Sequence, residues 1–176
     1  MGFQFEDGRG SGDLAYVDDH RVAVTSRVNP RIAYASKYDG LSFSWTHSYD
    51  HDAADTILLL SNSSTTKNLY LHTISIGADT ATQFVVHSPA YPTLAGTLVT
   101  GVNLNRTSGK VAEAECYGDE TGNTQANVIF SGFIGSSMTA ILPPEGTIIL
   151  GYHSCIAVDL VTAGTMGSVV FTGYYE

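Results

Sequence analysis

The densest group of chemically reactive side chains lies in residues 47–55, which read HSYDHDAAD. Its carboxylates belong to Asp50, Asp52 and Asp55, and its imidazoles belong to His47 and His51. Carboxylate oxygens suit Ca²⁺, but the stretch lacks the glycine and the terminal Glu of an EF-hand loop, and its histidines fit no structural zinc spacing. We interpret the stretch as a solvated turn whose Asp side chains accept hydrogen bonds from nearby backbone. Cation binding by the Asp50–Asp55 loop stays open as the alternative.

No other motif predicts catalysis. The glycine-rich segment at residues 8–12, GRGSG, precedes no helix that could bind a phosphate at its N-terminus. The nearest approach to a serine nucleophile motif, residues 151–155 (GYHSC), is typical of a turn between strands. Glu113 and Glu115 stand two positions apart in an alternating segment, so they share a solvent-facing side instead of opposing each other as glycosidase acids do. We therefore predict that the chain is not an enzyme, with no catalytic residue, no metal and no cofactor.

Composition restricts the classes of partner. Only 14% of the residues are charged, and the formal net charge is −9. An acidic chain is poorly suited to bind duplex nucleic acid or an anionic membrane surface, so we expect neither. The first residues lack the basic and apolar regions of a signal peptide, and no apolar run is long enough to span a membrane. Cys116 and Cys155 are interpreted as buried free thiols, with a disulfide between them left open.

The elements that would position these residues are strands. Leu41, Phe43 and Trp45 alternate strictly, whereas residues 56–61 form a continuous apolar run, which favours a strand buried on both faces. No window shows a sustained helical period, and turn residues recur between the apolar segments. Segments with strand character lie near residues 41–45, 56–61, 69–76, 84–86, 97–104, 111–116, 127–133, 138–142, 147–150, 154–161 and 168–174. This spacing predicts an all-β jelly-roll or β-sandwich of about 8–10 antiparallel strands.

The N-terminal part differs from the rest, so we divide the chain into an extended arm with a short hairpin, residues 1–40, and a jelly-roll domain, residues 41–176. Leu14 to Val28 reads as two short strands around an Asp-Asp-His turn, and residues 31–40 as an irregular connection. Phe3 and Phe5 alternate, which places both on one face of an extended strand. We expect them to anchor the arm on a partner, together with Arg9 and Tyr16. The alternative is a disordered terminus with incidental aromatic residues.

Three strings resemble structural proteins of tailed bacteriophages. They are TLVTGVNLNRTSG at residues 97–109, DETGNTQ at residues 119–125, and the glycine-rich arm that leads into AYVDDHR at residues 15–21. The resemblance implies a small β-sandwich that decorates or cements the capsid surface of a virion. Its partners would be the major capsid protein and its own copies, which we expect to form a homotrimer. The family supplies no catalytic residues.

A second hypothesis is a tail- or fibre-associated module that binds glycans or another receptor. Aromatic side chains can stack on sugars. Tyr91, between two prolines, and Tyr174 with Tyr175, at the end of the last expected strand, would offer such surfaces. The strand end near Tyr174 would also serve the first hypothesis as a contact between subunits.

Overall fold

The computed structural model describes residues 30–176, except residues 52–55, 91–93, 121–122, 124 and 164 and the side chains of Asp50 and His51. Before residue 30 it assigns three strands. The chain divides into two compact units, residues 1–30 and residues 31–176, and each is described by itself.

The first unit contains an antiparallel sheet of order β1-β2-β3. Its strands are β1 (Phe5–Glu6), β2 (Leu14–Asp18) and β3 (Arg21–Ala23). Asp18 pairs with Arg21 across the β2–β3 hairpin, and Phe5 pairs with Ala15. The side chains of residues 1–29 lie outside the described residues.

The second unit begins with a helix and continues as strands. Its elements are α1 (Arg31–Tyr34), the π-helical turn η1 (Ala35–Asp39), β4 (Ser42–His51), β5 (Thr56–Asn62), β6 (Leu69–Ala78), β7 (Thr82–His87), β8 (Thr97–Leu98), β9 (Val102–Asn103), β10 (Ala114–Glu120), β11 (Val128–Ile134), β12 (Met138–Leu142), β13 (Ile148–Leu150), β14 (Cys155–Leu160) and β15 (Thr165–Tyr175).

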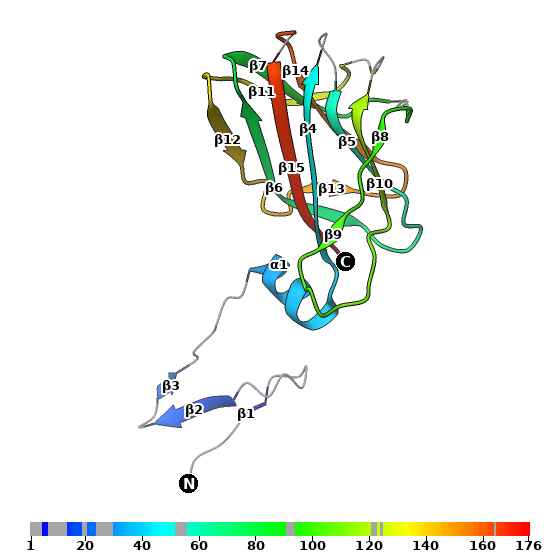
Figure 1. Ribbon diagram of the computed structural model, residues 1–176. Coiled ribbons are helices and arrows are strands. Elements are labelled where there is room, and N and C mark those ends of the chain that lie inside the picture. Colours follow the sequence, from blue (N-terminus) through cyan, green and yellow to red (C-terminus); the bar gives the residue numbers. More distant parts are fainter. Residues whose placement is uncertain are drawn as a thin grey trace. The chain divides into compact units, whose positions relative to one another are not determined.

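The strands form two antiparallel sheets packed face to face (Figure 1). One sheet has the order β11-β7-β14-β5-β10-β8, and the other has the order β12-β6-β15-β4-β9, with β13 also paired to β6. The strands β4, β5, β6, β7, β11, β12, β14 and β15 follow jelly-roll connectivity. Each strand of this series lies in the opposite sheet from the one before it, except that β11 lies beside β7 in the same sheet. The segment between β7 and β11 supplies β8, β9 and β10, which extend both sheets on the side away from β11 and β12. The predicted jelly-roll sandwich is confirmed.

The core lies between the sheets and follows the two-residue period of the strands. Phe43 and Trp45 are fully buried, as their alternation predicts. Phe43 packs edge-on against Tyr175, with ring centroids 5.7 Å apart. Every residue of β5 is buried, on both faces of the strand, and β14 and β10 pair with its two edges. The prediction of a strand buried on both faces is therefore confirmed.

Residues 31–40 are helical, so the expectation of an irregular connection was wrong. Pro30 precedes the helix, and no glycine or proline interrupts it before Gly40. Gly40 adopts φ 61°, a left-handed conformation that ends a helix, and its amide donates to the carbonyl of Ala35. Arg31 pairs with the side chain of Glu176 at 2.6 Å, which ties this helix to the end of the chain.

Two further expectations need correction. The segment expected as one strand at residues 97–104 is divided, because Val99 turns into the core and Gly101 packs against the Trp45 ring, where a Cβ would lie 2.5 Å from Nε1. Tyr174 and Tyr175 are buried rather than exposed. They belong to β15, which lies between β4 and β6, and Tyr174 stacks on Tyr70.

Candidate functional site: the apolar edge of the sandwich

Most of the arm and loop residues that the sequence singles out lie outside the described part of the chain. Phe3 and Arg9 are outside it, and Phe5 and Tyr16 are placed only as members of β1 and β2. Asp52 and Asp55 are likewise outside, and for Asp50 and His51 only the strand is assigned. Among the residues whose side chains are described, no group of three or more His, Cys, Asp or Glu is placed to hold a metal ion. The arm and the loop therefore stay predictions.

His47 is the histidine of the 47–55 stretch whose side chain is described. It is half-buried, stacks on Tyr49 with ring centroids 6.2 Å apart, and covers Gly118 so closely that a Cβ there would lie 2.2 Å from the imidazole. Burial lowers the pKa of His47, and the neighbouring Asp119 carboxylate partly offsets this. His47 is thus held toward its neutral form as a packing residue.

A buried polar cluster that the sequence did not reveal joins three neighbouring strands. Thr56 of β5 donates its hydroxyl to Asp159 Oδ1 of β14 at 2.7 Å. His87 Nε2 of β7 lies 3.0 Å from the same oxygen, without the alignment of a hydrogen bond. Thr56 and His87 approach the same oxygen, so the Asp159 carboxylate lies between them. In a hydrolytic triad the histidine lies between the nucleophile and the acid, so these three residues do not form a triad. All three side chains are buried, so the cluster pairs a carboxylate inside the sheet.

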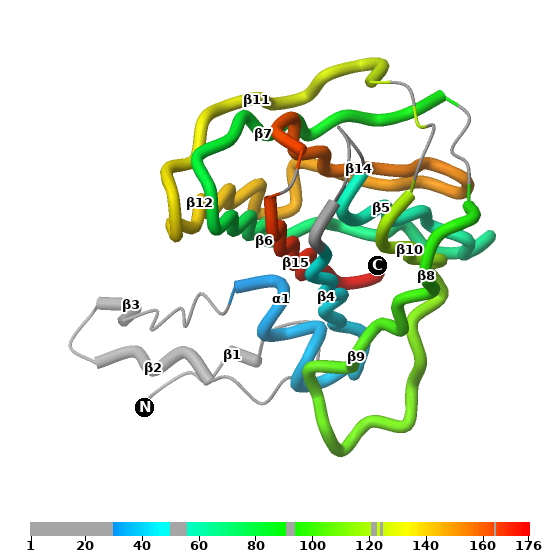
Figure 2. Tube along the Cα trace, turned by 45° about the horizontal axis from the view of Figure 1, so that its top comes forward, coloured from blue at the N-terminus to red at the C-terminus, as the bar shows by residue number. Residues whose placement is uncertain are grey.

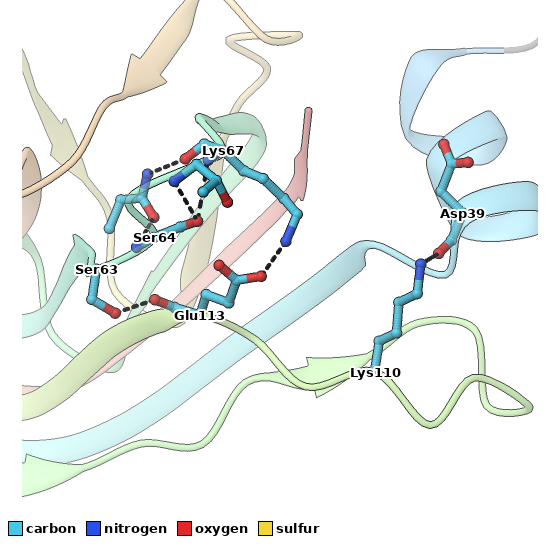
Figure 3. A network of polar contacts seen from close by, with 8 residues as sticks. Asp39, Ser63, Ser64, Lys67, Lys110 and Glu113 are labelled. Carbon is cyan, nitrogen blue, oxygen red and sulfur yellow. Dashed lines mark hydrogen bonds and ion pairs between the residues drawn. The ribbon is translucent and has the colours of Figure 1, made fainter.

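A second polar network fixes the loop between β5 and β6 (Figure 3). Lys67 forms an ion pair with Glu113, and the hydroxyl of Ser63 donates to the Glu113 carbonyl. The hydrogen bond from Lys67 is the main cause that lowers the pKa of the Glu113 carboxyl. Glu115 is exposed as expected. Glu113 immediately precedes β10 and is half-buried, with 38% of its side chain exposed.

Lys110, also drawn in Figure 3, donates to the main-chain carbonyl of Asp39 at 2.6 Å. It thereby ties the segment after β9 to the end of η1. Both lysines hold loops in place through backbone or carboxylate partners of this chain, so we assign these contacts to the stability of the scaffold.

The edge formed by β11 and β12 is unusual because it exposes large apolar side chains and carries no charged residue. β11 lies at the end of its sheet beside β7, and β12 lies at the end of the other sheet beside β6 (Figure 2). Both strands carry large apolar side chains in solvent, with exposed fractions of 54% for Val128, 84% for Phe133 and 64% for Ile141. Neither strand contains Asp, Glu, Lys, Arg or Pro, and the register of β11 with β7 shifts only near its start, between Val128 and Phe130. Edge strands of proteins that stay monomeric are usually protected by charge or proline, so this edge resembles an interaction surface.

An apolar pocket of about 300 Å³ opens along the same edge, between the sheets. One wall comes from Ile129 and Phe130 of β11, and the other from Leu142 of β12 and the Pro143–Pro144 turn that follows it. Phe130 is held in this position by stacking on Phe84, with ring centroids 6.0 Å apart. The pocket is thus a gap in the core at the open side of the sandwich, and it can receive an apolar side chain from a partner.

The sequence predicted strands at these positions but not their exposure. A run such as VIFSGFI has the composition of a buried strand, and only the sheet order shows that β11 lies at an edge. The signal available in the sequence was the absence of charged residues from both strands.

Comparisons add no relative. No family model matches the chain, and neither a curated protein nor a solved structure matches it. In the described part of the chain, none of the helices has the length and apolar character needed to cross a bilayer.

Proposed function

We propose that this chain is a non-catalytic structural protein of a bacteriophage virion, of the capsid decoration or cement type. It would sit on the capsid surface, bind the major capsid protein and bind its own copies. The observation that carries the proposal is the uncharged apolar edge of β11 and β12, because an exposed edge of this kind is typical of a surface that another protein covers.

The jelly roll is compatible with this role without selecting it, since the same architecture serves capsid proteins, lectins and enzymes. The resemblance of residues 97–109 to phage structural proteins supports the virion assignment. In the structure this string runs through β8 and β9 into a loop held by asparagine side chains. Asn105 Nδ2 donates to the carbonyl of Ser36 at 2.8 Å, and Asn103 Nδ2 donates to the carbonyl of Gly40 at 2.8 Å. The string therefore forms a rigid surface loop, which suits a fixed contact in an assembly.

The edge also offers a source of binding energy. Burial of apolar surface contributes about 25 cal/mol per Å² between subunits. Phe133, at 84% exposure, is the most exposed of the large apolar side chains in the described part of the chain, so covering it yields the largest gain available to a single residue there.

The test is occupancy on capsids that lack this protein. Purified protein is incubated with such capsids, which are then pelleted and imaged. We expect saturable occupancy that falls sharply for Phe133→Lys, while Val111→Lys serves as the matched control, since Val111 is 79% exposed and lies away from the edge. Deletion of residues 1–13 is expected to abolish occupancy and leave the sandwich folded. Equal occupancy for all of these proteins would contradict the proposal.

The glycan-binding hypothesis has lost one of its surfaces, because Tyr174 and Tyr175 are buried. Tyr91 lies outside the described residues. Saturable binding on a glycan array that is lost on Tyr91→Ala would favour this hypothesis over the capsid role.

A further inference from the structure

We propose that β11 of one copy pairs antiparallel with β11 of a second copy around a two-fold axis at Ser131, so that the two β11-containing sheets become one continuous sheet. This inference names one partner of the apolar edge. It requires only the purified chain, and thus it stands or fails separately from the virion role. A two-fold pair is also a different contact from the homotrimer expected above, which would need another surface.

The first step is that β11 has a free side. In the part of the chain that the structure describes, β7 is its only strand partner. The backbone N–H and C=O groups along its other side are therefore available to a further strand. A strand that pairs with these backbone groups must approach closely, so it must carry no charged side chain that repels β11.

The second step is charge. The chain carries a formal net charge of −9, so two copies repel over most orientations. β11 contains no ionisable residue, and neither does β12 beside it on the same side of the sandwich. This edge is hence a surface where two acidic copies can meet without opposing carboxylates.

The third step is register. The strand reads VIFSGFI from Val128 to Ile134, with Ser131 in the middle. Antiparallel pairing about Ser131 sets residue 130 of each copy opposite residue 132 of the other. Ile129 stands in the bulge between Val128 and Phe130 and lines the pocket, so the regular part of the pairing runs from Phe130 to Gly132. Phe133, which is 84% exposed in the single chain, follows this part of the strand and is covered by the second copy. A two-fold axis repeats every contact, which suits a self-complementary strand.

The fourth step is the space above Gly132. On the β7 side Gly132 pairs with Phe84, whose ring lies over it so that a Cβ at Gly132 would be 2.9 Å from the ring. On the free side the pairing brings Phe130 of the second copy beside the same glycine. A ring next to a glycine on a neighbouring strand covers exposed backbone, and a larger residue at position 132 would obstruct both rings.

The expected strength follows from the exposed area. Side chains of this size expose about 150–200 Å² when free, and the exposed fractions of Val128, Ile129, Phe130 and Phe133 scale this to roughly 400 Å² per copy. Two copies then bury on the order of 800 Å², which belongs to the weak end of specific interfaces. The pair is expected to form and dissociate with concentration in the micromolar range.

A cysteine at the two-fold axis gives the most direct test. Directly opposed residues have Cβ atoms about 4.5–5.5 Å apart, close to disulfide spacing. Ser131→Cys is expected to give a disulfide-linked dimer on mild oxidation, whereas the matched control Ser136→Cys, an exposed serine in the turn after β11, stays monomeric. The native thiols of Cys116 and Cys155 are buried and do not interfere. Cross-linking of both variants to the same extent, or of neither, would overturn the proposal.

A charge at the contact then tests the surface. Phe133→Lys is expected to weaken self-association by on the order of 100-fold, because it buries an unpaired charge. The matched control Val111→Lys, at a position that is 79% exposed and lies away from the edge, is expected to associate as the wild type does. Sedimentation measures the association, and Trp45 fluorescence verifies that each variant is folded. Equal association of both variants and the wild type overturns the proposal. Dimerisation without capsid binding would leave this inference standing and contradict the proposed function.

Discussion

Asn62 holds the β5–β6 loop against β13, and its replacement is the sharpest test of the fold. It is fully buried at the end of β5. Its Nδ2 donates to the carbonyls of Lys67 at 2.9 Å and Leu150 at 2.8 Å, and its Oδ1 accepts the amide of Ser64 at 3.1 Å. One side chain therefore joins the β5–β6 loop to β13, whose residue Ile148 lines the pocket.

The magnitude follows from these three bonds. Each contributes about 1 kcal/mol to the free energy of unfolding, and Asn62→Ala removes all three while leaving two buried carbonyls without that donor. We expect a loss of about 3 kcal/mol. For a domain of this size that corresponds to a decrease in Tm of about 6–12 °C. Urea unfolding followed by the fluorescence of Trp45, which is the one tryptophan and lies in the core, measures it.

Two further variants serve as controls. Asn68→Ala replaces an exposed asparagine nearby and is expected to change the free energy of unfolding by less than about 0.5 kcal/mol. Asn62→Asp keeps the shape but sets a carboxylate oxygen against two carbonyl oxygens, which disfavours the ionised form in the folded state. Its penalty is therefore largest at neutral pH and decreases as the pH falls toward about 4, where the unfolded chain also takes up the proton. A loss below about 1 kcal/mol for Asn62→Ala, or a pH-independent penalty for Asn62→Asp, would refute the reasoning.

Three further predictions concern titratable groups. Lys67 lowers the pKa of Glu113 in the folded state, so Glu113 stabilises the protein above its ordinary pKa, and this stabilisation is lost as the pH falls through the lowered pKa. The difference in unfolding free energy between the wild type and Glu113→Gln should therefore vanish in acid. A difference that stays constant with pH would contradict the ion pair. Burial lowers the pKa of His47, so the protein should lose stability as the pH falls below the ordinary histidine pKa, and His47→Gln should flatten that part of the stability curve; an unchanged slope would contradict this. Burial raises the pKa of both Cys116 and Cys155. Neither thiol should therefore react with a water-soluble thiol reagent at about pH 8 until the protein unfolds. Rapid labelling of the native protein would contradict their burial.

Strand positions were predictable because local periodicity encodes them. The alternation of Phe43 and Trp45 and the continuous run in β5 each follow from which faces of a strand are covered. The closing strands β14 and β15 were found for the same reason. The helical turn after Pro30 was missed because it is short, and its amphipathic pattern has too few residues to show a period.

Sheet order was not predictable in the same way, because it arises from contacts between distant segments. Thr56 and Asp159 are 103 positions apart, and only the pairing of β5 with β14 brings them together. The apolar run of β11 likewise has the composition of a buried strand. Its exposure follows from its place at the end of the sheet. The missing charge in β11 and β12 was visible in the sequence, but it has meaning only once both are known to be edges.

Amide hydrogen exchange of β11 as a function of protein concentration tests the central claim most directly. If the apolar edge is an assembly surface, exchange in residues 128–134 slows as concentration rises and copies associate, while exchange in the central strand β6 (Leu69–Ala78) is the same at every concentration. Exchange in residues 128–134 that stays fast while the protein demonstrably associates would show that another surface makes the contact, and would contradict the account.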